Sequence, residues 1–486
     1  MNRRRFCQSL TLGALYSGGV GFGAAAARRP NVVFVLADDL GWGDLDCYNA
    51  DSAVPTPSAN RLATEGMRFT DMHSASAVCT PSRYGILTGR YCWRTRLQHG
   101  VLEGYSPDLI EAGRLTMPLM LKQRGYYTCG VGKWHLGLGN EGRTDFSKPL
   151  RPGPVDHGFD YYFGIPASLD MAPYLYFEND RVVEPPTSTT PGSKQPRGVF
   201  WRPGPIAPGL KLEEVLPTIT SKAVGLIHDH MGKGRDPMFL YCALPAPHTP
   251  WLPLPEYRGR SKAGDYGDYA AEVDAMLGRI LDAVKESGEE DNTIFIFTSD
   301  NGADWKIEDE ARYAHRANAH WRGEKADIWE AGHRIPFLIR WPGHIRAGTV
   351  SDQLGCLTDV MASVAAVDGI ALPDNAAEDS YDLSPAWLGR ARGPIRPDII
   401  DHSIDGMFAM RRGRWKLEVG LGSGGFSAPR RVEAAPGGPK GQLYDLVKDP
   451  REIDNLYQRR PEIVDELETL LEKYRTQGYT RPMVRR

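Results

Sequence analysis

The stretch NVVFVLADD at residues 31–39 decides the fold class. After Asn31 it is an unbroken run of β-branched, aromatic and aliphatic residues, and it ends at two aspartates. A strand with no polar face is buried on both sides, as in a mostly parallel sheet covered by helices. Similar apolar runs recur at Tyr127–Val131, Met238–Leu244 and Thr293–Thr298.

Helical patterns separate these apolar runs. Thr116 and Pro118 are typical of a helix N-cap and first turn before Leu119–Gln123. Within Asp268–Lys285, apolar residues repeat at i, i+3 and i+4. Strands that alternate with helices predict an α/β fold, with a large doubly wound, mixed but mostly parallel sheet flanked by helices.

Two regions differ in composition from this core. Residues 145–215 are rich in proline and glycine, which predicts a long irregular insertion near the substrate-binding end. Further on, Met407–Met410 and Trp415–Val419 are typical of short strands, and Pro461–Tyr474 of a terminal helix. We therefore expect the main α/β domain at residues 28–388 and a smaller C-terminal α+β domain with an antiparallel sheet at residues 389–486.

The first 27 residues have the features of an export signal. Paired arginines at Arg3–Arg5 precede a weakly hydrophobic Leu10–Phe22 stretch and the small residues Ala24–Ala27. Arginine pairs before a glycine-rich apolar region favour the twin-arginine route over the general secretory one, so we expect a periplasmic or secreted protein. The apolar run is shorter than the ~20 residues that span a bilayer, so we expect no membrane span.

The overall charge limits the partners. The 486 residues carry a formal charge of −3 at pH 7. Such a chain has no basic excess to offset phosphates, which argues against a nucleic-acid partner. Any anion that the protein recognises must be bound by a local cluster of cations.

Polar side chains follow all four predicted strands. In open α/β sheets, ligands bind at the carboxyl ends of the strands, so these side chains predict one common site. In strand order they are Asp38 with Asp39, Lys133 with His135, His248, and Asp300 with Asn301.

A five-residue motif, Cys-Thr-Pro-Ser-Arg at Cys79–Arg83, carries a family resemblance. Together with residues 84–90, which follow it in the sequence, the motif resembles the signature of the type I, formylglycine-dependent sulfatases. These belong to the alkaline phosphatase superfamily and include arylsulfatases and N-acetylgalactosamine-6-sulfatases. The resemblance extends over most of the chain, through residues 37–39, 132–137, 247–250, 299–302, 322–332 and 443–456.

The resemblance implies a nucleophile made after translation and a bound metal ion. A formylglycine-generating maturation enzyme would oxidise Cys79, and the hydrate of the resulting aldehyde would attack sulfur. Carboxylates and an amide are hard oxygen donors, which suit Ca²⁺, with Mg²⁺ as the alternative, and not zinc. The implied metal ligands are Asp38, Asp39, residue 79 as formylglycine, Asp300 and Asn301.

The resemblance also assigns groups that handle charge and protons. Lys133 and Lys325 match the lysines that hold sulfate oxygens, and Arg83 matches the arginine that positions the formylglycine. His135 matches the histidine that takes a proton from the hydrate, and His248 matches the one that assists the leaving oxygen. Cations that meet developing charge in a dry site are the expected main source of catalysis.

Three functions from different classes stay open. The first is a sulfatase acting on sulfated carbohydrates or aryl sulfates. The second is a phosphonate or phosphate ester hydrolase on the same scaffold, and the third is a non-catalytic ligand-binding relative. The third would be expected to have lost Cys79 or a metal carboxylate, and neither is lost. The intact set of Lys133, His135, His248 and Lys325 favours sulfate over phosphonate.

Substrate contacts are expected from two segments. Asp170, Tyr174 and Tyr176 in the proline- and glycine-rich region have the polarity and aromatic faces that suit a sugar. His320 lies close to Lys325 in the chain, as do two other histidines, and is a further candidate contact. Export suits the degradation of external glycans, so we expect an exo-acting sulfatase for a galactose- or N-acetylgalactosamine-type 6-sulfate.

Overall fold

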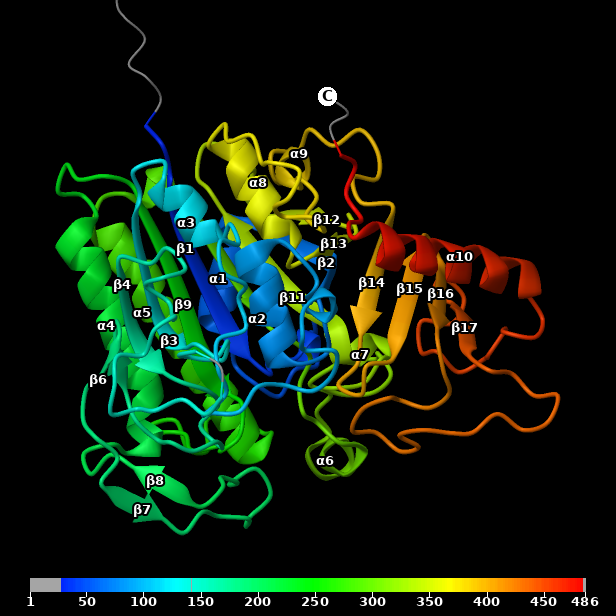
Figure 1. The fold of residues 1–486 in the computed structure, drawn as a ribbon, viewed down its shortest axis with the longest axis horizontal. Helices are drawn as coiled ribbons and strands as arrows, with labels where there is room; N and C mark the ends of the chain where they lie inside the picture. Colours follow the sequence, from blue (N-terminus) through cyan, green and yellow to red (C-terminus); the bar gives the residue numbers. More distant parts are fainter. Residues whose placement is uncertain (1–27, 141, 484–486) are drawn as a thin grey trace, which may run out of the picture.

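The computed structural model describes residues 28–140 and 142–483, so the predicted export signal at residues 1–27 lies outside the described residues. Its centre is an 11-stranded mixed sheet, flanked by helices (Figure 1). In sheet order the strands are β12 (Thr349–Ser351), β2 (Met67–His73), β11 (Arg334–Arg340), β10 (Thr293–Ser299), β1 (Asn31–Asp38), β9 (Met238–Pro247), β3 (Tyr127–Lys133), β4 (Tyr161–Ile165), β5 (Phe177–Glu178) and β6 (Arg181–Val182), with β13 (Gly355–Cys356) also paired to β2.

Two groups of helices pack on this sheet. One group contains α1 (Pro57–Glu65), α4 (Val215–His230) and α5 (Gly264–Glu286), which contact one another and β9 or β11. The other contains α2 (Cys79–Thr88), α3 (Met117–Lys122) and α8 (Asp359–Val367) (Figure 1). The predicted doubly wound α/β architecture is confirmed. Among the described residues, no helix is both long and apolar enough to cross a membrane.

A second, four-stranded antiparallel sheet lies towards the C-terminus. It consists of β14 (Asp398–His402), β15 (Phe408–Arg412), β16 (Trp415–Glu418) and β17 (Gln442–Asp445) in that order. Helix α10 (Pro461–Gln477) covers it and buries Val464, Leu467 and Leu471 (Figure 1). This agrees with the expected antiparallel C-terminal sheet. The remaining helices are the short α6 (Ile307–Tyr313), α7 (Glu330–His333) and α9 (Ser384–Trp387).

The proline- and glycine-rich residues 145–215 are less irregular than expected. Strands β4, β5 and β6 extend the main sheet beyond β3, and β7 (Ser188–Thr190) pairs with β8 (Gly204–Ile206). Aromatic packing fixes this extension, because the Tyr162 ring stacks on Phe177 of the next strand with centroids 5.5 Å apart. These strands are two to five residues long, too short to give a periodic signal among prolines and glycines.

Strand register brings the four polar strand ends together. Strands β10, β1, β9 and β3 are adjacent and parallel. Ala37 of β1 pairs with Ser299 of β10, and Asp38 pairs with Pro247 of β9. On the far side of β9, Gly132 of β3 pairs with Ala243. The residues that follow these pairs therefore leave the sheet at one edge, as the sequence predicted.

Candidate active site

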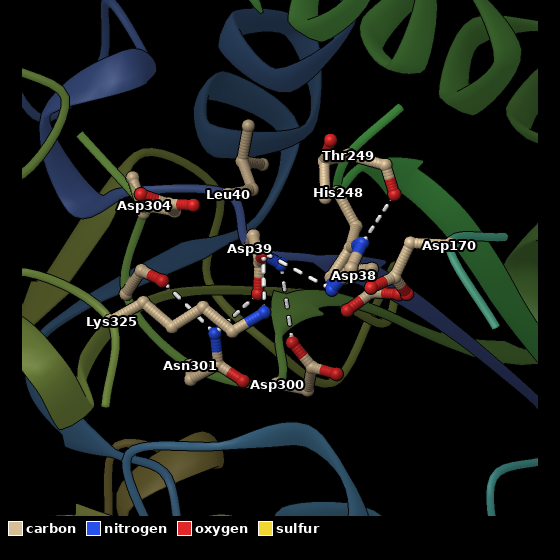
Figure 2. Close-up of polar contacts among 12 residues, drawn as sticks. Asp38, Asp39, Leu40, Asp170, His248, Thr249, Asp300, Asn301, Asp304 and Lys325 are labelled. Carbon is tan, nitrogen blue, oxygen red and sulfur yellow. Dashed lines mark hydrogen bonds and ion pairs between the residues drawn. The ribbon is translucent and has the colours of Figure 1, made fainter. Parts of the chain in front are cut away.

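Four oxygen-bearing side chains meet beyond the ends of β1 and β10 (Figure 2). Asp39 has a left-handed backbone, with φ of 65°, and its N–H donates to Asp300 Oδ1 at 3.2 Å. Asn301 Nδ2 donates to Asp39 Oδ1 at 2.7 Å. Asp38, Asp300 and Asn301 are fully buried, and Asp39 nearly so. The structure thus places the predicted oxygen donors in one cluster.

Two lysines reach this cluster from different segments. Lys133, at the end of β3, donates from Nζ to Asp38 Oδ2 at 2.6 Å. Lys325 donates from Nζ to Asp39 Oδ2 at 2.7 Å (Figure 2). Burial opposes the charged form of Lys325, but Asp39 raises the pKa of its ammonium well above the ordinary value. Lys325 therefore remains a cation in a site with almost no solvent contact.

A third cation, Arg83, connects the helix α2 to the strand ends. Its Nε and Nη2 donate to Asp300 Oδ2 at 3.1 and 2.7 Å. Its Nη1 donates to the carbonyl of Lys133 at 2.9 Å. The fully buried guanidinium thus joins α2, β3 and the end of β10 in a fixed geometry.

The cluster fits a hard divalent cation. Asp38 Oδ1 and Asn301 Oδ1 are buried without a hydrogen-bond partner in the described structure. Burial opposes ionisation of Asp38, yet Lys133 keeps the pKa of that carboxyl well below its usual range. Burial and the charge of Asp38 raise the pKa of Asp300. Crowded carboxylates with free carboxylate and amide oxygens are the donor set that Ca²⁺ or Mg²⁺ prefers.

Cys79 is the first residue of α2 and is buried beside the same cations. Burial raises the pKa of its thiol, although the charges of Lys133 and Lys325 oppose the shift. A nucleophilic cysteine needs a lowered pKa and an accessible thiolate. Cys79 therefore lacks the activation of a cysteine nucleophile.

Backbone carbonyls orient the two predicted histidines. His135 Nε2 donates to the Leu102 carbonyl at 2.7 Å, which leaves Nδ1 as a buried acceptor without a partner in the described structure. Burial, with the charge of Lys133, lowers the pKa of His135 well below its usual value, so the ring is neutral. His248 Nδ1 donates to the Thr249 carbonyl at 2.6 Å, and its Nε2 lies 3.7 Å from Asp39 Oδ2 (Figure 2).

The predicted substrate contacts fall in different places. Asp170 is buried, with Oδ2 accepting from Arg202 at 2.5 Å and Oδ1 unpartnered in the described structure, on the side of the cluster towards His248 (Figure 2). His320 is exposed and lines a cavity beside α6. The Tyr174 side chain is almost fully buried and its hydroxyl donates to the Arg202 carbonyl, so the expected aromatic face for a sugar is not exposed there.

Two histidines near Lys325 in the chain have structural partners instead. His315 is fully buried and contacts Asp44 Oδ1 at 2.8 Å. His333 is fully buried, with its Nδ1 2.9 Å from Nδ1 of His73. His73, Glu330 and His333 form a second group of potential metal ligands. Lys416 already contacts two of these three side chains. Its Nζ lies 3.1 Å from His333 Nε2 and 3.2 Å from Glu330 Oε1.

The groups that orient the two histidines could not be predicted from the sequence. The acceptors are main-chain carbonyls of Leu102 and Thr249, and any residue type supplies a carbonyl, so composition carries no signal for them. Gly302 has a clearer signal, since it follows Asp300 and Asn301. A Cβ at this position would lie 1.7 Å from the Ala331 carbonyl oxygen, so only glycine fits.

The fold and the site define the class of the protein. Buried cations, a candidate cation site and two oriented histidines converge at the carboxyl edge of a doubly wound sheet. Such a site suits an enzyme that acts on an ester of an oxyanion, because fixed positive charge stabilises the charge that develops on the anion.

Comparisons with known proteins name the family. The sulfatase family model matches residues 30–370. The chain is 36% identical over 489 residues to an N-acetylgalactosamine-6-O-sulfatase of Bacteroides thetaiotaomicron, covering 93% of this chain and 94% of the relative. It is 35% identical over 453 residues to human arylsulfatase A, covering 89% and 84%. The chain therefore belongs to the sulfatase family and is a sulfatase enzyme, as its motifs predicted.

A solved structure supports the same assignment. It comes from Bacteroides thetaiotaomicron and was described in work on the metabolism of multiple glycosaminoglycans. The two folds agree with a TM-score of 0.83 at 35% identity, and the match covers 93% of this chain and all of the other.

Proposed function

We propose that this sulfatase hydrolyses sulfate monoesters of sugars, with a formylglycine made from Cys79 as the nucleophile. The observation that carries the proposal is the position of Cys79 at the start of α2, beside Lys133 and Lys325, with a thiol that burial keeps protonated. The hydrate of formylglycine supplies two hydroxyls on one carbon, one for attack on sulfur and one whose deprotonation expels sulfate. A buried thiol supplies neither.

The predicted oxygen donors would hold a Ca²⁺ ion, with Mg²⁺ as the alternative. Asp38, Asp39, Asp300 and Asn301 would bind it together with an oxygen of the modified residue 79. The unpartnered oxygens of Asp38 and Asn301 support this assignment. When bound, the ion supplies positive charge that favours an ionised hydroxyl and stabilises sulfate oxygens.

Two protein cations would stabilise the charge on the reacting sulfate, and a third would position residue 79. Ion pairs with Asp38 and Asp39 fix Lys133 and Lys325 before substrate arrives, so little reorganisation is needed during the reaction. Arg83 holds the start of α2, and so residue 79, against the strand ends.

The two histidines would move protons. His135 is neutral and keeps Nδ1 free, so it can accept the proton of a hydroxyl on residue 79. His248 donates from Nδ1 to a carbonyl, so its imidazolium form would carry the second proton on Nε2 and give it to the leaving alcohol, with Lys325 nearby to assist.

A sugar 6-sulfate is the proposed substrate. The relative from Bacteroides thetaiotaomicron is named for N-acetylgalactosamine 6-O-sulfate, and it covers 93% of this chain. Asp170 supports a sugar, because its buried Oδ1 is a free acceptor for a hydroxyl at the edge of the site. We propose exo-action on an N-acetylgalactosamine- or galactose-type 6-sulfate.

Export and domain organisation complete the proposal. Residues 1–27 would direct the protein through the twin-arginine route to the periplasm or outside, after a formylglycine-generating enzyme has oxidised Cys79 in the cytoplasm. Residues 28–388 would form the catalytic domain, and residues 389–486 the smaller C-terminal domain.

A substrate panel tests the reaction class. Purified protein, co-expressed with a formylglycine-generating enzyme, is assayed with 6-sulfated N-acetylgalactosamine, 6-sulfated galactose, an aryl sulfate and an aryl phosphonate ester. We expect the highest kcat/KM with a 6-sulfated sugar, loss of turnover in Cys79→Ala, and retention in Cys47→Ala, a cysteine substitution outside the site. Phosphonate turnover above sulfate turnover would identify the enzyme as a phosphonate ester hydrolase instead.

A further inference from the structure

A cavity of about 560 Å³ opens between α6 and the C-terminal domain. Its walls come from residues 305–308 with 310, residues 316 and 319–324, and Trp329, and from residues 426–428 with 451 and 453 of the C-terminal part of the chain. Figure 1 shows α6 below α7, facing the loops of the C-terminal sheet. The volume falls in the ~300–1,000 Å³ range of small-molecule sites.

The wall of this cavity includes the segment that leads into Lys325. Its lining residue Glu324 directly precedes Lys325, whose ammonium binds Asp39. The main-chain N–H of Lys325 donates to the Ala303 carbonyl, two residues from another lining residue, Trp305. Figure 2 shows the Lys325 segment and Asp170 on different sides of Asp39.

Three exposed apolar side chains from separate segments gather at the cavity. Ile307 of α6 is 77% exposed, Phe426 is 46% exposed and Ile453 is 69% exposed. Exposed apolar side chains that gather at a cavity beside polar groups are typical of a ligand-binding site. The C–H faces of a sugar ring are a suitable partner for such a rim.

Two buried polar atoms in the lining residues have no partner among the described residues. They are Oε2 of Glu324, a residue that is 5% exposed, and Nε1 of Trp321. A buried polar group without a hydrogen bond is costly, so these two residues keep unmet hydrogen-bonding capacity in the wall of the cavity. Burial and the nearby charge of Asp304 raise the pKa of Glu324, which favours a carboxyl that can both donate and accept. Hydroxyl groups of a saccharide meet these requirements.

The cavity also presents unpaired positive charge. Lys306 and Arg451 are exposed lining residues, and neither takes part in an ion pair among the described residues. Of the two exposed or half-exposed acids at the same cavity, Glu310 is opposed by Arg316 at 3.6 Å, and only Glu308 is left to offset these two cations. Free cations beside hydroxyl-binding groups favour a sugar that carries a carboxylate or a sulfate.

We propose that this cavity is a second saccharide subsite, which holds the acidic sugar next to the sulfated residue of an oligosaccharide substrate. The proposal rests on the proposed sugar sulfatase activity and deepens it. An enzyme with this subsite prefers a sulfated disaccharide with an acidic neighbour to the free sulfated monosaccharide, and Arg451 contributes to that preference.

The test compares two substrates and matched variants. Sulfate release is measured with 6-sulfated N-acetylgalactosamine alone and with the same sugar linked to glucuronic acid. We expect wild-type kcat/KM to be about tenfold higher for the disaccharide, the size of one charge-assisted contact. Arg451→Ala and Phe426→Ala should each lower this ratio, whereas Arg392→Ala, an exposed arginine that does not line the cavity, should keep it. Equal ratios in wild type and in both cavity variants would overturn the subsite.

A binding measurement separates this proposal from the proposed function. Calorimetric titration with the unsulfated disaccharide should show binding to wild type and weaker binding to Arg451→Ala. If wild type releases no sulfate from either substrate, the proposed function fails, while retained disaccharide binding that depends on Arg451 still supports the subsite. Absence of disaccharide binding to wild type overturns the subsite.

Discussion

The ammonium of Lys325 lies 2.7 Å from Oδ2 of Asp39, while the amide of Asn301 donates to the other oxygen of the same carboxylate at the same distance. One carboxylate thus holds a cation and an amide that come from different segments. This arrangement fixes positive charge within the buried cluster.

Replacing this lysine tests its role. We predict that Lys325→Met lowers kcat for a 6-sulfated sugar by about 10²–10³-fold, because one preorganised electrostatic contact to the reacting anion is lost. Sulfate release under saturating substrate measures the effect. Lys440→Met, a substitution of an exposed lysine, should leave kcat near wild type. A kcat for Lys325→Met within twofold of wild type would remove this lysine from the catalytic step.

The cation site makes a prediction about stability. A divalent ion relieves the repulsion that raises the pKa of Asp300, so its removal should destabilise the fold. An ion present at 100 times its dissociation constant adds about 2.7 kcal/mol to the free energy of unfolding. We expect EGTA to lower the thermal midpoint of wild type and added Ca²⁺ to restore it.

Variants connect that thermal response to the proposed ligands. Asp300→Asn should show a much smaller difference between EGTA and Ca²⁺, whereas the surface variant Asp291→Asn should respond like wild type. An identical response in all three proteins would place the ion elsewhere, or show that no ion binds.

A buried charge network joins the two sheets and predicts a stability effect. Lys416 of β16 donates from Nζ to Glu452 Oε1 at 2.8 Å and to the Ile328 carbonyl at 2.9 Å. Lys416 is fully buried, so its removal leaves carboxylates without a partner. We predict that Lys416→Met lowers the free energy of unfolding by about 3–5 kcal/mol. Urea denaturation measures this, and the exposed Lys448→Met is the control; equal midpoints for the two variants would contradict the prediction.

The buried histidine His402 predicts how stability depends on pH. Burial lowers its pKa to about 4, with a smaller effect from His99. Between the ordinary histidine pKa of 6.5 and about 4, the unfolded chain binds a proton that the folded protein does not. The free energy of unfolding should therefore fall as pH falls through this window, by up to about 1.4 kcal/mol per pH unit.

The matched variants isolate this contribution from that of other groups. Urea midpoints at about pH 7, 6 and 5 should fall less steeply for His402→Gln than for wild type. His228→Gln, which replaces a half-exposed histidine on α4, should retain the wild-type slope. The same slope in His402→Gln as in wild type would show that this histidine is not the group that titrates.

The parts of the fold that sequence predicted are those with a strong local signal. The run at residues 31–36 lies within β1, where every residue is buried, and the α5 pattern extends a few residues beyond the prediction, to Gly264–Glu286. Strands β4 to β6 could not be found, because partner strands and aromatic packing, not local pattern, define them.

The candidate site was predictable to a similar degree. Strand-end reasoning placed Asp38, Lys133 and Asp300 at one edge, and the register of the parallel strands explains why they meet. The ion pairs between them, the carbonyl of Leu102 that orients His135, and the cavity beside Glu324 depend on distant segments. No local pattern encodes such contacts.

The central claim is that residue 79 acts as formylglycine, and the mass of one peptide tests it most directly. Trypsin releases residues 69–83 from protein that has been shown to liberate sulfate. The account predicts a peptide that is lighter than the cysteine form by the mass difference between cysteine and formylglycine. Finding only unmodified cysteine in that active protein would contradict it.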